Sequence, residues 1–379
     1  MRICYFADGR YIHALRWMRY FAAKGHEMHL ISFAEVGPEQ IAELEAAGVK
    51  YHGHTRHFHI KKFWLTLRDL RFVRSVLKRE KIDILHSHFL GANAWYGAFS
   101  GFPHIITIMG GGDVNGPDWR PDSNIQARFL TPYALRKADH ITSWSKLMAD
   151  VVRPYCGDKK PIGVVHGGIH LERFSPGEKP TYLLEKLQIP ADAKVVFSPR
   201  LMRPLSNIDK IAAAFEIVLE AFPGAFLVLA APAAERDLEY ENAVKKTIDQ
   251  FGGTANARFV GPVLHDEIAD NFRLADVTVS IPDIDGTPMT VLESMACGTP
   301  TVIGDLADYD KEYFEHEVTT LMVDVKNAQS IADAMLRYLT NTELAGKIAN
   351  EARRRVEETG SYEFQMEKMD ATYHRVLGR

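Results

Sequence analysis

The chain has 379 residues, of which 46% are hydrophobic and 25% are charged, and its formal net charge at pH 7 is −4. This composition is that of a soluble globular protein, and the length exceeds what one ordinary hydrophobic core supports, so two domains are expected. The weak negative charge excludes a global attraction to nucleic acid or to an anionic membrane, so any such attraction must be local.

The three cysteines, Cys4, Cys156 and Cys297, are too few and too far apart for a disulfide framework or a zinc site. Cys4 and Cys297 lie in apolar runs, which favours buried reduced thiols and a reducing compartment. The opening MRICYFADGR lacks the features of a signal peptide, and the apolar run at 221–234 is interrupted by proline and glycine and is too short to span a bilayer. We therefore expect a soluble, cytoplasmic protein.

Short apolar runs alternate with amphipathic helical segments along the whole chain. Such runs are typical of parallel strands that are buried on both faces, and the alternation predicts βαβ units in doubly wound parallel sheets. About six strands are expected in each half, at 2–7, 27–33, 83–88, 104–109, 140–145 and 162–166 and then at 194–199, 225–231, 258–263, 276–281, 300–304 and 320–324. Since ligands bind beyond the carboxyl ends of such strands, the loops that follow them are where chemistry is expected.

Within the first half, residues 50–81 are basic and rich in histidine. Ten Lys or Arg against two Asp or Glu give this segment a charge of +8, and Phe63 and Trp64 begin an apolar stripe at helical spacing. One hypothesis is that the segment docks on anionic lipid or binds a phosphorylated or lipid-linked acceptor. The alternative is an ordinary domain helix whose stripe faces the sheet. No carboxylate or cysteine joins the histidines at 52, 54, 57 and 59, so we predict no metal site there.

Two other places in the first half are candidates for ligand contact. His13 follows the first loop, and the turn IMGGGDV at 108–114 places three consecutive glycines directly after a strand. Consecutive glycines suggest that the backbone approaches a ligand closely, although a flexible turn has the same composition. The candidates are His13, Gly111, Gly112 and Asp113.

The segment at 167–186 is rich in glycine, proline and charge, and it separates the two groups of strands. We place the domain boundary there, with one Rossmann-like domain over 1–173 and a second over 174–359. Two such domains facing each other leave a cleft between the carboxyl ends of their strands. The residues at 359–379 are predicted to form a last amphipathic helix.

In the second half, Arg200 comes directly after the strand in KVVFSPRLMRPLSNID, where a guanidinium can clamp a diphosphate with two hydrogen bonds. Arg203 and Lys210 are less fixed, and solvated side chains are the ordinary alternative for them. The backbone at Gly261 and Val263, at the end of the predicted strand 258–263, is a surface against which a base could lie, or simply a strand end.

The stretch IPDIDGTPMTVLESMACGTP, at 281–300, predicts a loop followed by a helix that ends at Gly298. Pro288 suits the first turn, because its missing N–H costs nothing there. The helix N-terminus then offers unpaired amides to a phosphate, those of Met289, Thr290 and Val291. Asp285 can accept hydrogen bonds from sugar hydroxyls, and Glu293 can accept them from a ribose. The alternative is a helix cap at Asp285 and a solvated glutamate.

The order of Arg200, the Gly-Pro-Val that ends at Val263, and Asp285-x7-Glu293-SMACGTP resembles the donor domain of the retaining family-4 glycosyltransferases, also called glycosyl transferases group 1. Segments at 8–32, 85–95 and 163–176 resemble further parts of that family, so the resemblance covers nearly the whole chain. It implies the GT-B fold, in which an N-terminal domain binds the acceptor, a C-terminal domain binds a nucleotide-sugar, and the last helix, 360–379, packs back on the first domain.

The resemblance also implies the roles of individual residues. Glu293 would bind the ribose, Asp285 would contact the transferred sugar, and Arg200 would neutralise the diphosphate, which makes these three the catalytic set. The implied donor-binding set is Gly9, Gly261, Val263, Gly286, Thr287, Pro288, Met289, Thr290 and Val291. The implied contacts on the acceptor or sugar side are His13, Gly111, Gly112 and Asp113.

The chain departs from the family pattern at three positions. The first acid of the acid-x7-acid motif is usually glutamate and here is Asp285. The lysine that usually follows the arginine by five residues is Leu205 here, and Met109 or Gly110 stands where many members have a histidine. These departures put the family's acceptor-side histidine contact and the lysine's share of the diphosphate clamp in question.

The mechanism that the resemblance implies is hexosyl transfer from a UDP-sugar or related donor with retention of configuration, in which the leaving phosphate accepts the proton from the acceptor hydroxyl. No protein nucleophile, metal or cofactor is expected. The implied acceptor is a carbohydrate, a lipid-linked compound or a small molecule, in glycan biosynthesis, with no nucleic-acid partner and with membrane contact, if any, peripheral at the inner surface through 50–81. An epimerase of the same fold and a non-catalytic two-lobed sugar-binding protein stay open as alternatives.

Overall fold

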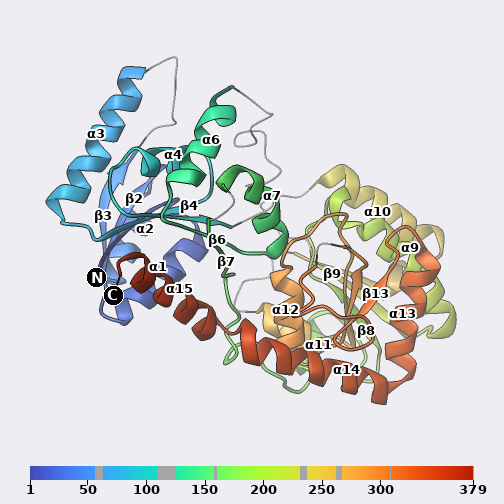
Figure 1. The fold of residues 1–379 in the computed structure, drawn as a ribbon. Coiled ribbons are helices and arrows are strands. Elements are labelled where there is room, and N and C mark those ends of the chain that lie inside the picture. The colour runs from blue at the N-terminus through green and yellow to red at the C-terminus, as the bar shows by residue number, and fades with distance from the viewer. Residues whose placement is uncertain are drawn as a thin grey trace. The chain divides into compact units, whose positions relative to one another are not determined.

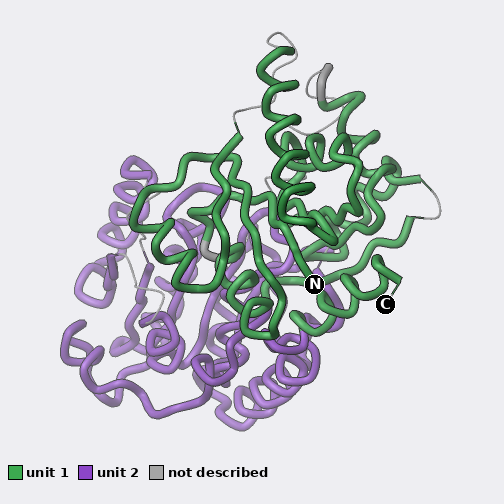
Figure 2. Tube along the Cα trace, turned by 90° about the vertical axis from the view of Figure 1, so that its left-hand side faces the viewer, with its two compact units in different colours: residues 1–167, 365–379 green, residues 168–364 purple. Residues whose placement is uncertain are grey.

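The computed structural model describes residues 1–55, 63–109, 125–157, 160–230, 237–261, 267–307 and 309–378. The chain divides into two compact units, unit 1 with Met1–Gly167 and Gln365–Arg379 and unit 2 with Gly168–Phe364 (Figure 2). Each unit contains one parallel sheet with helices packed against it (Figure 1). The predicted α/β class with two Rossmann-like domains is therefore confirmed.

The sheet of unit 1 has seven parallel strands in the order β3-β2-β1-β4-β5-β6-β7. They are β1 Arg2–Ala7, β2 Glu27–Ser32, β3 Val49–His54, β4 Ile84–His88, β5 His104–Ile108, β6 His140–Ser143 and β7 Ile162–Val164. The sequence pattern predicts six of them and misses β3, whose residues VKYHGH are largely polar. A polar strand is tolerated there because β3 is at the edge of the sheet, where one side has no neighbouring strand.

The helices of unit 1 connect these strands and cover the sheet. They are α1 Ile12–Ala23, α2 Pro38–Ala46, α3 Phe63–Arg79, α4 Ala92–Ala98, α6 Ile125–Lys137 and α7 Lys146–Cys156. The last helix, α15 Tyr362–Val376, also lies in this unit from Gln365 onward. Its Tyr373 hydroxyl is buried and hydrogen-bonded to the Tyr5 hydroxyl of β1 at 2.9 Å and to Nδ1 of His86 in β4 at 2.6 Å. These bonds fix the end of the chain against the centre of the first sheet.

The sheet of unit 2 has six parallel strands in the order β10-β9-β8-β11-β12-β13. They are β8 Val195–Ser198, β9 Phe226–Ala230, β10 Ala257–Val260, β11 Val277–Ser280, β12 Thr301–Gly304 and β13 Leu321–Val323. Val195 and Phe197 pack into one hydrophobic cluster and Val196 packs into another. Successive side chains of a strand point to opposite faces, so both faces of this sheet are covered, which explains the nearly continuous apolar runs.

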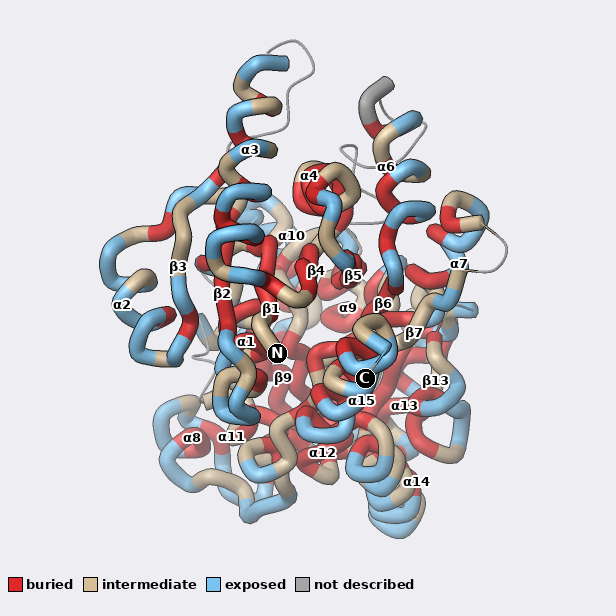
Figure 3. Tube along the Cα trace, turned by 60° about the vertical axis from the view of Figure 1, so that its left-hand side comes forward, coloured by how far each residue is buried: buried red, intermediate tan, exposed pale blue. Residues whose placement is uncertain are grey.

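The helices of unit 2 are α8 Thr181–Lys186, α9 Ile208–Ala221, α10 Leu238–Gln250, α11 Ile268–Leu274, α12 Met289–Ala296, α13 Ala328–Thr340 and α14 Thr342–Arg355. A short π-helical turn, Val356–Gly360, links α14 to α15. Buried residues concentrate in the strands of each unit, and the outer faces of the helices are exposed (Figure 3).

All three cysteines are buried and free, as predicted for Cys4 and Cys297. In the part of the chain that the structure describes, no helix combines the length and the apolar character that crossing a bilayer requires.

Candidate functional site

The predicted catalytic residues belong to unit 2, and two of them meet at the carboxyl edge of its sheet. The strands β8, β11 and β12 are neighbours in the sheet, so the loops that follow them start at the same edge. Arg200 follows β8, Asp285 follows β11 and Tyr309 follows β12. Residues that are far apart in the sequence are thus brought together by the strand order alone.

Arg200 and Asp285 form an ion pair in which Nη1 lies 2.8 Å from Oδ2. The two side chains are only 17% and 15% exposed. Burial raises the pKa of the Asp285 carboxyl above its ordinary value, and the Arg200 guanidinium, the Gly286 amide and Arg203 act in the opposite direction. A carboxylate and a guanidinium are therefore held in a partly dry site, where they act more strongly on a charged ligand than they would in water.

The loop that carries Asp285 is fixed by Asn207, the residue before α9. Its Nδ2 donates to the carbonyl oxygen of Ile281 and to Oδ1 of Asp283, both at 2.8 Å. The amide of Asp283 donates to the carbonyl oxygen of Leu205 at 3.0 Å. The Leu205 side chain is 39% exposed, so this position contributes its backbone to the loop and offers no charge in place of the family lysine.

The helix α12 begins at Met289, with Pro288 as the residue that precedes it. The prediction that three amides are unpaired at this end is wrong for Val291, whose N–H donates to the carbonyl oxygen of Pro288 at 2.9 Å. The first turn is tightened by this bond, as often occurs at helix ends. No acceptor is found for the amides of Met289 and Thr290 among the described residues. Two amide donors therefore remain available at the positive end of the helix dipole.

Glu293 lies one turn further along α12. It is half-buried on a helix whose other residues at 291, 292, 294 and 295 are buried. The rotation of the helix is fixed by Ser294, whose hydroxyl donates to Oγ1 of Thr278 in β11 at 2.8 Å. The helix ends as predicted, because Gly298 has φ +75° and its amide donates to the Met295 carbonyl at 3.0 Å.

Sequence reasoning missed Tyr309 in the loop after β12. The side chain is 5% exposed, and its hydroxyl has no hydrogen-bond partner among the described residues. Burial raises the pKa of this hydroxyl, the Asp285 charge raises it further and Arg200 opposes the rise, so Tyr309 lies within electrostatic reach of the ion pair. The rule that ligands bind beyond strand ends could have pointed to this loop, but no motif marks the tyrosine itself.

Other buried hydroxyls near the same edge also lack hydrogen-bond partners in the described parts of the chain. They are those of Ser198, the last residue of β8, Ser280, the last residue of β11, and Thr290 in the first turn of α12. Buried polar groups are nearly always hydrogen-bonded, so unpaired ones mark a place where water or a ligand completes the bonding. With Arg200 and two open amides, this edge offers several donors to an anion that carries hydroxyl groups.

The glycines predicted to contact the donor have other surroundings. Gly9 is a buried residue of unit 1, and a Cβ there would come within 2.7 Å of Cγ2 of Val36. This contact accounts for glycine at position 9 without a ligand. Gly261 is exposed after β10, the edge strand, and β9 lies between β10 and β8. Val263 lies outside the described residues.

On the acceptor side, His13 lies in the first turn of α1, in unit 1. Its ring meets that of Trp144 edge-to-face, with centroids 5.0 Å apart, and lies 5.2 Å from the ring of Tyr11. Burial, with a smaller effect of Arg16, lowers the pKa of His13 to about 4, so the imidazole is neutral at physiological pH. Met109 is buried, and Gly111, Gly112 and Asp113 lie outside the described residues.

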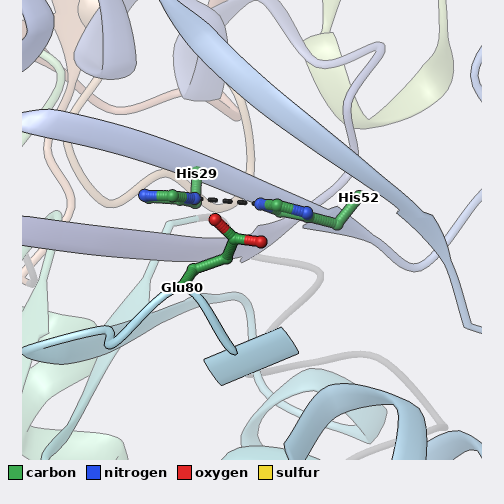
Figure 4. Close-up of side chains that lie close together, drawn as sticks. All are labelled: His29, His52 and Glu80. Atoms are coloured by element: carbon green, nitrogen blue, oxygen red, sulfur yellow. Dashed lines mark hydrogen bonds between the residues drawn. The ribbon is translucent and has the colours of Figure 1, made fainter. Parts of the chain in front are cut away.

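Among the described residues, a histidine pair in unit 1 is the arrangement that most resembles a metal site (Figure 4). The nearest ligand atoms of His29, His52 and Glu80 lie within 4.8 Å of one another. However, Nδ1 of His29 lies 2.9 Å from Nε2 of His52, and the two rings are nearly parallel, at 10°. One of these nitrogens must carry the proton that the other accepts, whereas a metal ion requires both nitrogens unprotonated. Arg79 also lies 3.3 Å from Nδ1 of His52. We interpret the group as a hydrogen-bonded histidine pair.

A pocket of about 310 Å³ lies at the opposite, amino-terminal edge of the unit 2 sheet, beside Lys194, Arg273 and Asp276. Lys194 lies 3.5 Å from Asp276, and Arg273 lies 2.8 Å from Asp270, so its cations already have acidic partners. Its position before the strands also separates it from the edge where Arg200 and Asp285 meet.

The comparisons with known proteins agree in both halves of the chain. The family model described as glycosyltransferase family 4 matches residues 9–173, and the model described as glycosyl transferases group 1 matches residues 182–355. The D-inositol 3-phosphate glycosyltransferase of Mycobacterium tuberculosis is 24% identical over 98% of this chain and 80% of its own length.

Two solved structures show the same fold over nearly their full length. The glycosyltransferase from Rickettsia africae matches with a TM-score of 0.81 at 16% identity, over 99% of this chain and 98% of that chain. HepE from Anabaena, solved in complex with UDP-glucose, matches with a TM-score of 0.76 at 16% identity, over 98% of this chain and 99% of that chain.

Proposed function

Since the chain belongs to the family-4 glycosyltransferases of the GT-B fold, we propose that it transfers a hexose from a nucleotide-diphosphate sugar to an acceptor hydroxyl with retention of configuration. A UDP-sugar is the proposed donor. The similarity to HepE, which binds UDP and UDP-glucose, supports this choice. The proposal requires no metal or cofactor.

The observation that carries the proposal is the group of donors at the carboxyl edge of the second sheet. The buried Arg200–Asp285 ion pair lies beside the orphaned Tyr309 hydroxyl, and α12 presents two open amides at the same edge. These groups suit a diphosphate that carries a sugar, because cations, helix N-termini and hydroxyl donors all stabilise phosphate oxygens.

In the proposed complex, Arg200 leaves Asp285 and takes the diphosphate, together with the amides of Met289 and Thr290. Asp285 is then free to accept hydrogen bonds from the hydroxyls of the transferred sugar. Glu293 binds the ribose, and the Tyr309 hydroxyl donates to a phosphate oxygen in place of the lysine that Leu205 replaces. The members of the implied donor-binding set from Gly286 to Val291 lie in the loop and first turn that carry these groups.

In the transfer step, the acceptor oxygen forms a bond to the anomeric carbon on the face that the diphosphate leaves. The bond from that carbon to the phosphate oxygen breaks, and the hydroxyl proton passes to the departing phosphate oxygen. The task of the protein is to stabilise the negative charge that develops on the diphosphate. Arg200 and the N-terminus of α12 are the groups placed for it.

The test is calorimetric titration of the wild type, Arg200→Ala and Glu293→Ala with UDP and UDP-glucose, followed by NMR of the product. We expect micromolar binding by the wild type, loss in both variants and an unchanged anomeric configuration in the product. Equal affinity in all three proteins would refute the site. Release of an altered UDP-sugar without acceptor would identify an epimerase, and binding without turnover would identify a sugar-binding protein.

A cytoplasmic location and an acceptor that is a carbohydrate, a lipid-linked compound or a small molecule complete the proposal. Peripheral membrane contact through residues 50–81 belongs to it as well.

A further inference from the structure

Helix α3 has two halves with different surroundings. In the half near its C-terminus, Val73, Val76 and Leu77 are buried against Cys4 and Phe6 of β1. In its first turn, Phe63 is 61% exposed and Trp64 is 67% exposed. Packing against the sheet thus explains the apolar residues of the second half but leaves the two large aromatic side chains of the first turn in contact with solvent.

A second helix of unit 1, α6, also exposes large aromatic side chains, and sequence reasoning did not single it out. In α6, Phe129 is 66% exposed and Tyr133 is 37% exposed, and the two residues are one turn apart on the same face. Arg128 and Arg136 are exposed beside them.

The two helices are joined through Phe99, the residue that follows α4. The guanidinium of Arg74 in α3 donates to the carbonyl oxygen of Phe99, with Nη2 at 2.6 Å. The ring of Phe99 stacks on that of Tyr133 in α6, with centroids 5.0 Å apart and an angle of 22° between the planes. The exposed faces of α3 and α6 therefore belong to one connected part of the surface.

Both helices are strongly basic. α3 contains five Lys or Arg and one Asp, a net charge of +4, and α6 contains three Lys or Arg and no acid, a net charge of +3. The whole chain has a net charge of −4, so this is a local concentration of positive charge. Exposed aromatic rings beside basic side chains are the combination that binds the interface of an anionic bilayer, since the rings enter the headgroup region and the cations meet the lipid phosphates.

The topology places this surface at a particular edge of the sheet. α3 follows β3 and α6 follows β5, and a helix that connects parallel strands starts at their carboxyl edge. Figure 1 and Figure 3 both show the first turns of α3 and α6 extending beyond the sheet of unit 1 on the same side. The loop that leads to His13, after β1, starts at this edge too.

We infer that Phe63, Trp64 and Arg71 of α3, with Arg128, Phe129 and Tyr133 of α6, form a docking surface for an anionic lipid bilayer. Docking brings the carboxyl edge of the first sheet to the membrane. Docking in this orientation favours a lipid-linked compound among the three proposed acceptor classes. This choice of acceptor rests on the proposed function.

Sedimentation with vesicles tests the docking surface. The wild type is mixed with vesicles of phosphatidylcholine alone and of phosphatidylcholine with phosphatidylglycerol, and binding to the anionic vesicles only is expected. Arg71→Glu combined with Arg128→Glu should lower the partition coefficient at least about tenfold, because basic residues near the surface are attracted to anionic headgroups and acidic ones are repelled. Trp64→Ser combined with Phe129→Ser should produce a loss of similar size.

Matched controls come from unit 2. Leu238 is 62% exposed and Lys347 is exposed, so Leu238→Ser removes an exposed apolar side chain and Lys347→Glu reverses one exposed charge away from the docking surface. These variants should bind like the wild type. Equal sedimentation with both kinds of vesicle, or an equal loss in the controls, would overturn the inference. Binding of an RNA oligonucleotide with the same dependence on Arg71 and Arg128 would also overturn it.

The orientation of docking is tested by a fluorophore attached to a single new cysteine, which is practical because the three native cysteines are buried. Arg10→Cys places the label at the carboxyl edge of the first sheet, and Glu45→Cys places it near the amino end of β3. Spin-labelled lipid should quench the first label and leave the second unaffected, whereas equal quenching would refute the orientation. Calorimetry with UDP on the docking variants separates the two proposals, because loss of vesicle binding with intact UDP binding concerns the docking surface alone.

Discussion

The carboxyl edge of the unit 2 sheet collects charged and hydroxyl-bearing side chains, whereas the same edge of the unit 1 sheet collects aromatic rings. In unit 2, Arg200 and Asp285 form an ion pair near the hydroxyl of Tyr309, which has no hydrogen-bond partner among the described residues. In unit 1, the rings of Phe89 and Trp144 flank those of Tyr11 and His13, with centroids 5.0 to 5.3 Å apart from one neighbour to the next.

The two edges also differ in the environment that they provide for ionisable groups. Unit 2 holds a carboxylate in a partly dry site by placing a cation beside it, while unit 1 keeps its histidines neutral by burying them. Both sheets have the same parallel topology, so the difference comes from the loops and not from the fold. We therefore expect the unit 2 edge to suit the proposed diphosphate and the unit 1 edge to suit a less charged molecule.

The largest effect is expected for Arg200→Ala. Removing the cation takes away the main stabilisation of charge on the leaving diphosphate, and kcat/KM for UDP-glucose should fall by roughly 100-fold to 1000-fold. Arg200→Lys keeps the charge but cannot form bidentate hydrogen bonds with the diphosphate, so it should retain an intermediate activity. Steady-state kinetics measure both variants, with Lys347→Ala as the control for a distant cation. A loss below threefold in Arg200→Ala would mean that the edge is not the donor site.

The next largest effect is expected on the pH dependence of stability, through the neutral histidines of unit 1. His88 is fully buried, its ring nitrogens have no partners among the described residues, and burial lowers its pKa from 6.5 to about 3. Because the unfolded chain binds a proton that the folded state does not, stability rises with pH between about 3 and 6.5. Lowering the pH from 7 to 5 should cost about 2 kcal/mol through this residue. His88→Leu should remove that part of the pH dependence, which urea titrations at the two pH values measure. An unchanged slope would contradict the neutral, buried state.

Arg200 illustrates what can be predicted from the sequence alone. Arg200 was predictable because it follows a recognisable strand and precedes Asp285-x7-Glu293, whose family spacing survives in the sequence. The strand order, which places β8, β11 and β12 side by side, also follows from the fold that the motif implies. The existence of the sheets and most of their strands could be predicted in the same way, from apolar runs of strand length.

Other features depend on contacts that no local pattern records. The amide of Val291 is paired because it donates to the carbonyl oxygen of Pro288 in the first turn of α12. Tyr309 lies in a loop without a motif, and only the three-dimensional packing shows that its hydroxyl has no partner in the described parts of the chain. β3 was not predicted because an edge strand needs little apolar character. Gly9 packs against Val36, and the sequence alone cannot distinguish this packing role from a ligand contact.

A smaller effect is expected for Tyr309→Phe. In the free protein the hydroxyl makes no hydrogen bond with the described residues, so its removal should leave the free energy of unfolding unchanged or slightly higher. In the proposed donor complex the hydroxyl donates to a phosphate oxygen, so the affinity for UDP should fall about fivefold to tenfold. Calorimetry and chemical denaturation on the same sample give the two quantities. A loss of stability with unchanged UDP affinity would assign Tyr309 to the core and not to the site.

The smallest effect is the pH dependence that Asp285 imposes on unit 2, and its sign is opposite to that of His88. Because burial raises the pKa of Asp285 above 3.8, the folded state binds a proton that the unfolded chain has lost. Stability through this residue is therefore highest at low pH and decreases as the pH rises from 3.8 through the raised pKa. Asp285→Asn cannot ionise, so its free energy of unfolding, relative to the wild type, should increase over that interval and then level off. Denaturation of the two proteins at several pH values from 3.5 to 7 measures the difference. If the difference decreased with pH instead, the effect of Arg200 on the pKa of Asp285 would be larger than the effect of burial. The two sheets would then differ in the ligands they suit and not in how their stability depends on pH.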